Sequence, residues 1–255
     1  MSVLSLVRRR EVRVTHCLPV FLPSGDSALV LQFSDRIDAE VNARVIALAA
    51  AIETAGMAGV IEVVPSYRSL LVRYDPEIVR GRALEERLAE LSTDVDGAGW
   101  QGRAWTIPVV YGGEVGQDLE EIAALKKLSP REVIALHVAN EYRVFMIGFA
   151  PGLAYLGGLP PILHTPRLQI PRQNIPAGAI GIGGQQGSVN SVAGPSGWRF
   201  IGWTPVRLFD PSREVPFLLR AGDRVRFAPI DSETGAQLAR RAAAGDTVVE
   251  PRVPV

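Results

Sequence analysis

Glycine and proline divide the second half of this chain into pieces that are too short for long helices. Twelve of the 25 glycines lie between Gly148 and Gly202. They separate short apolar runs, which read VFMIGF, AIGIGG, WRFIGW, VRLF and RVRFAPI. Many short strands punctuated by turn residues are typical of a closed or partly closed β-barrel. We therefore predict a mostly-β barrel domain in this part of the chain.

The first part of the chain has a different pattern, in which strand-like runs alternate with amphipathic runs. Asp38 opens a run whose apolar residues recur at helical spacing, and Gly56 ends it. The order β-α-β-β-α predicts a small α+β layer with helices on one face of an antiparallel sheet. The strands are expected at 28–33, 60–65 and 69–74, and the helices at 38–56 and 83–91.

A polar, glycine-rich segment at 93–102 (TDVDGAGWQG) separates these two patterns. We place a domain boundary there, which gives an N-terminal α+β domain at 1–97 and a barrel domain at 98–255. A strand AWTIPVVY should open the second domain, and two helices should follow at 118–128 and 130–140. The expected N-caps of these helices are Asp118 and Ser129, and Glu132 completes a capping-box spacing with Ser129.

The barrel sequence is also unusual in charge, because no acidic residue occurs between Glu141 and Asp210. Arginine forks pair with carboxylates or phosphates, and glycine allows close approach of backbone to a ligand. The stretch therefore suits a site for an anion, although a loop-rich β domain that happens to lack acids would look the same. Its five arginines are Arg143, Arg167, Arg172, Arg199 and Arg207.

Composition and motifs argue against several other functions. Lys+Arg and Asp+Glu both number 27, so no net field favours nucleic acid or a membrane surface. The single cysteine, Cys17, and three scattered histidines give no metal-ligand cluster, and P-loop and G-x-S-x-G motifs are absent. No apolar run is long enough for a membrane span, and no secretory signal is recognisable. The expected location is the cytoplasm.

The segment IPAGAIGIGGQQG is the most site-like part of the barrel. Gly183 and Gly184 are expected to offer backbone N–H groups to an oxyanion, and Gln185 and Gln186 to offer amide groups. Tyr155 and Trp198 are candidate stacking walls for the same site.

Two further features leave alternatives open. Arg167 and Arg172 in TPRLQIPR fit an anion clamp, but solvated loop arginines are an equal interpretation. His137 lies among apolar neighbours on its helix, so a core position is favoured, and we keep it as a candidate substrate contact.

Taken together, the motifs resemble the family of the 5-oxoprolinase B subunit, also called KipI and allophanate hydrolase subunit 1. The chain is also similar to one half of the carboxyltransferase domain of urea carboxylase, namely subdomains C and D. The resemblance runs from about Gly25 to Phe227. It rests on EVVPSYRSLLVRYD, SPREVIALHVANEYRVFMIGFAPGLAYLGGLP, TPR, IPAGAIGIGGQQG and GWRFIGWTPVRLFD.

This resemblance implies a cyclophilin-like barrel and a set of partner proteins. It implies a homologue of the C subunit, which is the other carboxyltransferase half, and a homologue of the A subunit. The complex opens the lactam of 5-oxoproline to glutamate with ATP hydrolysis, and these partners are possible sites for ATP. Pro151, Gly152, Tyr155, Arg167 and Trp198 are among the positions that carry over to the substrate site.

The chain departs from the family pattern near the expected site. Gln186, Asn190 and Trp203 stand where the family usually has threonine, proline and arginine. These changes put the identity of the substrate in doubt.

We therefore predict one component of an ATP-dependent amide or lactam hydrolase of the 5-oxoprolinase type, inactive alone, that contributes an anion and amide site shared with the C subunit. Two alternatives stay open. One is a KipI-like inhibitor of a histidine kinase. The other is a component of the carboxyltransferase or allophanate hydrolase type that acts on another amide.

Overall fold

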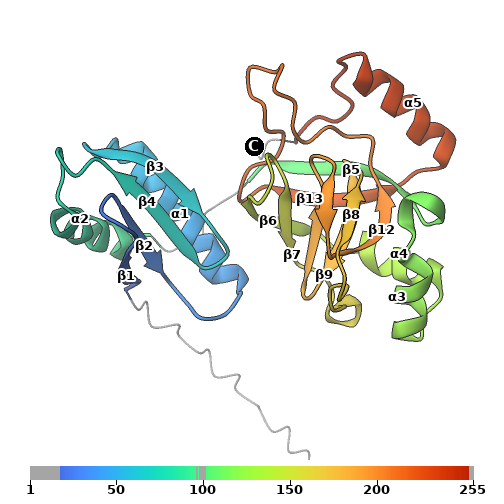
Figure 1. Cartoon of the computed structure of the whole chain (residues 1–255), viewed down its shortest axis with the longest axis horizontal. Coiled ribbons are helices and arrows are strands. Elements are labelled where there is room, and N and C mark those ends of the chain that lie inside the picture. The colour runs from blue at the N-terminus through green and yellow to red at the C-terminus, as the bar shows by residue number, and fades with distance from the viewer. Residues whose placement is uncertain (1–17, 96, 98–101, 253–255) are drawn as a thin grey trace, which may run out of the picture.

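The structure is a computed structural model that describes residues 18–95, 97 and 102–252. Figure 1 shows two bodies, an N-terminal lobe built from the residues before the gap and a barrel lobe built from those after it. Residues 98–101, where the predicted boundary begins, lie outside the described residues, as do Cys17 and the N-terminal segment before it. Within the described ranges, no helix combines the length and apolarity needed to cross a membrane.

The N-terminal lobe is a four-stranded antiparallel sheet covered by two helices on one face. The strand order is β1-β2-β4-β3, and leucine, isoleucine and valine side chains fill the space between the sheet and the helices. The elements are β1 (Val20–Pro23), β2 (Ala28–Gln32), α1 (Ala39–Ala55), β3 (Val60–Pro65), β4 (Ser69–Tyr74) and α2 (Gly81–Thr93).

Helix α1 begins and ends at the residues that its sequence predicts. The Asp38 carboxylate accepts hydrogen bonds from the backbone N–H groups of Glu40 and Val41, at 2.8 and 3.1 Å. Gly56 ends the helix in the left-handed conformation, with φ 54°, where the absence of a Cβ removes the steric penalty.

The barrel lobe contains a closed barrel of seven strands in the order β10-β7-β6-β13-β5-β12-β9. This confirms the predicted barrel. All strand pairs in it are antiparallel except β13 with β5, which is parallel. The strands are β5 (Ala104–Tyr111), β6 (Tyr142–Ile147), β7 (Ala154–Gly157), β9 (Ala179–Gly183), β10 (Gln186–Val189), β12 (Arg199–Trp203) and β13 (Arg224–Pro229).

Shorter elements surround the barrel. Strands β8 (Arg172–Ile175) and β11 (Gly194–Ser196) pair with each other outside it. The helices are η1 (Gly113–Gly116), α3 (Leu119–Lys126), α4 (Pro130–Val138), η2 (Pro161–Leu163) and α5 (Ser232–Ala243).

Two details of the barrel differ from the predictions. The run VRLF forms no strand, because Phe209 makes only an isolated bridge with Phe217. Asp118 precedes α3 but makes no side-chain cap bond. Its carboxylate instead accepts hydrogen bonds from both terminal nitrogens of Arg172 and from the backbone N–H of Phe200, so it ties three segments together. The predicted capping box of Ser129 and Glu132 is present.

The two lobes meet through a fully buried asparagine. Asn42 of α1 donates from Nδ2 to the carbonyl oxygens of Ser66 and Tyr67 in its own lobe, at 3.1 and 3.2 Å. The same nitrogen lies 3.0 Å from the carbonyl oxygen of Phe145 on β6 of the barrel. Tyr67 also contacts the barrel, since its ring packs edge-on against Phe145 and Tyr155. The β3–β4 turn therefore docks on the barrel wall.

Candidate functional site

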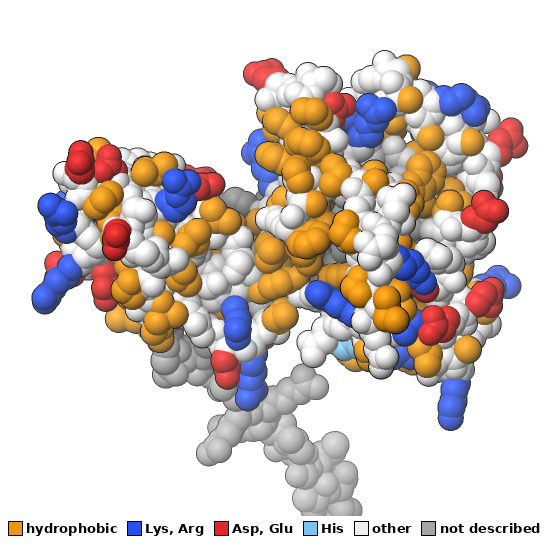
Figure 2. Space-filling model, viewed as in Figure 1, with side chains coloured by type: hydrophobic (Ala, Val, Ile, Leu, Met, Phe, Trp, Pro, Cys, Tyr) orange, Lys and Arg blue, Asp and Glu red, His pale blue; other side chains and the backbone are white. Residues whose placement is uncertain are grey.

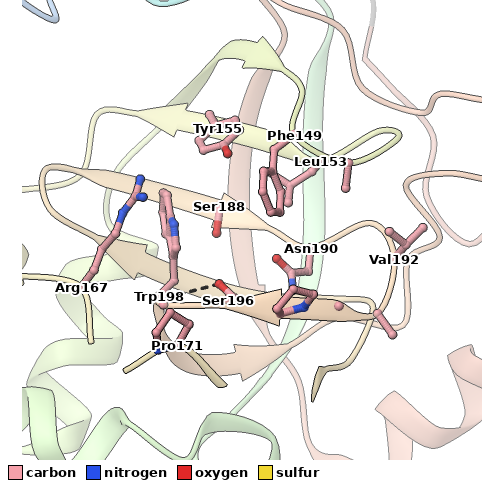
Figure 3. A pocket seen from close by; sticks show the side chains of 15 residues that line it. Phe149, Leu153, Tyr155, Arg167, Pro171, Ser188, Asn190, Val192, Ser196 and Trp198 are labelled. Atoms are coloured by element: carbon pink, nitrogen blue, oxygen red, sulfur yellow. Dashed lines mark hydrogen bonds between the residues drawn. The ribbon is translucent and has the colours of Figure 1, made fainter. Parts of the chain in front are cut away.

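A pocket of about 420 Å³ opens on the outer surface of the barrel, over strands β7, β9 and β10 (Figure 3). Phe149, Leu153 and Tyr155 line one side, and the segment from Val192 to Trp198 lines the other. Ser188 and Asn190, both buried, lie between them on the β10 side. The volume is in the range of small-molecule sites, and the walls are mainly apolar with a few polar groups.

Arg167 is the one charged residue among those described as lining this pocket. Its guanidinium carbon lies 5.0 Å from the centroid of the Trp198 ring, in the geometry of a cation–π contact. Figure 3 shows the two side chains next to each other at one end of the pocket. Among the described residues no carboxylate lines the pocket, so the guanidinium is available to an anionic ligand.

Glycines allow Trp198 to lie across strand β9. Ile180 and Ile182 point into the barrel core, which places Gly181 and Gly183 on the outer face. A Cβ on Gly183 would lie 2.6 Å from Cδ2 of Trp198, and one on Gly181 would lie 2.7 Å from Oγ of Ser188. The glycines of GIGG therefore make room for the indole ring that forms the pocket wall.

The N-terminal lobe adds an aromatic ring to the surroundings of the site. The Tyr67 ring lies 5.7 Å from that of Tyr155, which lies 5.8 Å from Trp198. Burial raises the pKa of both phenols above the ordinary value, while the neighbouring Arg167 acts in the opposite direction. Both hydroxyls are therefore neutral donors at physiological pH.

A second hollow, of about 580 Å³, lies between the lobes on the other side of Arg167. We call it the interlobe cleft. Arg36 and Ile37 line it from the N-terminal lobe, and Arg167 and the hairpin from Gly183 to Gln186 line it from the barrel. The predicted residues Gly183, Gly184, Gln185 and Gln186 therefore gather here, whereas Tyr155 and Trp198 line the pocket, and Arg167 lines both.

The structure shows one of the two predicted oxyanion donors bonded within the protein. The N–H of Gly184 donates to the carbonyl oxygen of Thr165 at 2.7 Å, in an isolated bridge between the two residues. Gly183 pairs with Gln186 in the β9–β10 ladder. The Gly184 N–H is therefore not free for a ligand in this structure.

His137 is also not a substrate contact. It is fully buried beneath the barrel wall, where its ring stacks on Phe227 and its Nδ1 lies 2.8 Å from the Tyr111 hydroxyl. Burial lowers the pKa of the imidazole to about 3, so His137 is a neutral core residue. The sequence pattern already favoured that interpretation.

The remaining predicted site residues lie beside the pocket or bind other groups of the protein. Pro151 and Gly152 are not lining residues, although their neighbours Ala150 and Leu153 are. Gly152 has φ 74° and packs against Phe209, so it shapes the loop. Arg172 is not half of a clamp with Arg167, because it is paired with Asp118.

Sequence reasoning missed two residues that line the hollows, Arg36 and Ser188, and the ring of Tyr67 that packs against Tyr155. Arg36 and Tyr67 come from the other lobe, and nothing local in their sequence indicates that they face the barrel. Ser188 could have been found, since it alternates with the inward-facing Gly187 and Val189 along β10.

Comparison with known proteins assigns the family. A family model described as the carboxyltransferase domain, subdomain C and D, matches residues 19–219. A protein from Bacillus subtilis (strain 168), named as the B subunit of 5-oxoprolinase, is 44% identical over 223 residues, which cover 82% of this chain and 92% of that relative. The chain belongs to the family of 5-oxoprolinase B subunits. All residues that line the pocket and the cleft lie within the part that matches the family model.

Solved structures agree with the fold of this family member. The crystallised protein TTHA0988 is 37% identical with a TM-score of 0.71, over 80% of this chain but only 40% of that longer chain. The urea carboxylase of Kluyveromyces lactis is 18% identical with a TM-score of 0.74, over 91% of this chain and 23% of its own. The second likeness shows a shared fold.

Within the described part of the chain, no group of three or more His, Cys, Asp or Glu side chains is arranged to hold a metal ion.

Proposed function

We propose that this protein is one component of a 5-oxoprolinase-type complex and that the pocket beside Trp198 binds the small anionic lactam. The observation that carries the proposal is the Arg167 guanidinium at the end of a mainly apolar pocket, whose described lining has no carboxylate. A cyclic amide with one carboxylate needs apolar walls for its ring and one cation for its charge. The relative from Bacillus subtilis is named as the B subunit of 5-oxoprolinase, which supports the same role.

Each polar group in the pocket has a place in this assignment. The Arg167 guanidinium pairs with the substrate carboxylate, and the rings of Trp198 and Tyr155 enclose the lactam ring. Ser188 and Asn190 lie deeper, where their side chains can hydrogen-bond the lactam C=O and N–H. Asn190 is one of the positions at which this chain departs from the family pattern, so it is a residue expected to tune the substrate preference.

The pocket supplies binding rather than a complete catalytic set. Opening the lactam breaks the ring C–N bond and adds water across it, which needs proton transfer and activation of the carbonyl. The pocket lining provides one guanidinium, hydroxyls and an amide. We therefore assign the ATP site and the acid–base groups to the homologues of the A and C subunits, with the substrate held at a shared interface.

The test is reconstitution with the homologues of the A and C subunits, followed by ATP-dependent release of glutamate from 5-oxoproline. Turnover that requires all components supports the proposal. The Asn190→Ala variant should raise KM with the complex intact, and the exposed Gln173→Ala, outside the pocket lining, is the matched control. A stable complex that turns over a different amide but not 5-oxoproline would overturn the assignment of the substrate and support that of the site. Full turnover by this chain alone would overturn the division of labour.

A further inference from the structure

The interlobe cleft has the groups of a second anion site, which shares only Arg167 with the proposed lactam site. Its walls come from both lobes, with Arg36 on one side and Arg167 on the other. Figure 2 shows Lys and Arg side chains on both sides of the gap between the lobes. The residues described as lining the cleft supply two guanidinium groups and two amide side chains, and no carboxylate.

The two amide side chains of the cleft differ in exposure. Gln185 is exposed at the tip of the β9–β10 hairpin, where its amide N–H groups can reach a ligand. Gln186 is only 6% exposed, and its side chain interacts with the neighbouring buried hydroxyl of Tyr67. The exposed amide of Gln185 is therefore the uncharged donor of this cleft.

The charges around the cleft favour an anionic ligand. Arg36 has one ion pair among the residues described, with Asp35 at 3.9 Å, and both side chains are more than four-fifths exposed, at 89% and 85%. Such an exposed pair is weak and does not neutralise the cleft. Arg167 is held by the Trp198 ring rather than by a carboxylate.

We propose that the interlobe cleft binds a phosphate-type oxyanion. The guanidinium groups of Arg36 and Arg167 approach it from opposite lobes, and the exposed amide of Gln185 donates from the hairpin. A tetrahedral anion with several acceptor oxygens can accept donors from all these directions, which a planar carboxylate does less well. The inference depends on the cleft residues alone, so it does not require the lactam assignment.

The ligand could be inorganic phosphate or the phosphate of a nucleotide, and one titration series separates them. The full chain is titrated by calorimetry with sodium phosphate, ADP and ATP at constant ionic strength, with chloride as the blank. Saturable binding of inorganic phosphate assigns a simple phosphate site. Binding of the nucleotides but not of phosphate assigns the same oxyanion chemistry to a nucleotide.

Three variants connect the binding to the cleft. Arg36→Ala should weaken it at least about tenfold, because one charge-assisted contact is lost. Gln185→Leu, which preserves the volume and removes the exposed amide, should weaken it as well. Arg87→Ala removes the same charge from the exposed surface of α2, outside the cleft lining, and should have no effect.

Two outcomes would overturn the proposal. One is the absence of saturable binding of any of the three anions. The other is binding that Arg36→Ala leaves unchanged, which would mean an anion held elsewhere. The cleft and the pocket can fail separately, because Arg36 does not line the pocket and Asn190 does not line the cleft. Loss of lactam turnover in Asn190→Ala with phosphate binding intact would confirm that they are two sites.

Discussion

The guanidinium of Arg167 lies over the ring of Trp198, at 5.0 Å from its centroid, and the two side chains mark the border between the pocket and the interlobe cleft. A cation held by an aromatic ring keeps its N–H donors free, unlike a cation paired with a carboxylate. Arg172, five residues further on, shows the contrast, because both of its terminal nitrogens are bound by Asp118. Of these two arginines, only Arg167 has no carboxylate partner among the described residues.

Replacement of Arg167 should weaken substrate binding without destabilising the fold. Arg167→Ala should weaken binding of 5-oxoproline to the reconstituted complex by about tenfold to a hundredfold, because a charge-assisted contact of about 1.5–3 kcal/mol is lost. The thermal midpoint should change little, because the side chain is exposed. Arg167→Lys keeps the charge but lacks the planar fork and should recover only part of the affinity. Unchanged affinity in the alanine variant would remove Arg167 from the site.

A methyl group at Gly183 should displace the pocket wall. The added Cβ would lie 2.6 Å from Trp198, so Gly183→Ala should destabilise the barrel by about 1–3 kcal/mol, measured by chemical denaturation. The fluorescence of Trp198 should shift as the indole moves. Gly194→Ala is the control, because a Cβ there meets no atom within 4 Å. Equal stability of the two variants would contradict the close packing.

The carboxylate of Asp118 should matter more to stability than its position before a helix suggests. It is 2% exposed and accepts from the Arg172 guanidinium and from the N–H of Phe200. Asp118→Asn should destabilise the protein by about 2–4 kcal/mol, below the full value for a buried pair because the Arg172 side chain is 30% exposed. Glu62→Gln breaks the exposed pair with Arg73 and should change stability by less than about 1 kcal/mol.

The contact between the lobes should depend on Asn42. Asn42→Ala removes the amide that bonds Phe145 across the interface, and it should destabilise the protein by about 2–3 kcal/mol. We also expect calorimetry to resolve two unfolding transitions in the variant where the parent shows more overlap. Thr54→Ala, on the exposed side of the same helix, is the control. A variant that keeps the parent profile would mean that other contacts join the lobes.

His137 should make the folded state sensitive to acid. Its pKa is lowered to about 3 by burial, so below its ordinary pKa of about 6.5 the unfolded state takes up a proton that the folded state does not. Stability should therefore fall as the pH drops from about 6.5 towards 3, by about 2 kcal/mol between pH 6.5 and 5. Above pH 7 this contribution is constant.

The His137→Asn variant tests that assignment. It should be less stable at every pH, because it loses the packing on Phe227, but its stability should depend less on pH in this window. Urea denaturation at several pH values measures both effects. An unchanged slope would place the responsible group elsewhere.

The fold could be predicted to the extent that local signals decide it. Asp38 and Gly56 bound α1 as expected, and β3, β4 and β5 have the predicted ends, because caps, turns and apolar periodicity are local. The run VRLF was misassigned, since its strand-like composition is overridden by packing outside the barrel.

The site could be predicted only in part, for a related reason. The hairpin from Gly183 to Gln186 and the residues Arg167 and Trp198 stood out by composition, and they do gather. Part of what the glycines do was missed, since Gly183 accommodates Trp198 and the N–H of Gly184 donates to Thr165. Arg36 and Tyr67 could not be found, because their place beside the barrel depends on how two separately folded segments dock.

The start of β5, which pairs with β13 in parallel, also lies beside the last residues that the structure describes. Ala104 begins β5, and Arg252 returns beside it, with hydrogen bonds in both directions at 2.9 and 2.8 Å. The chain therefore enters and leaves the barrel at the same place. A domain fused after Arg252 would therefore begin beside the point where the chain enters the barrel from the N-terminal lobe.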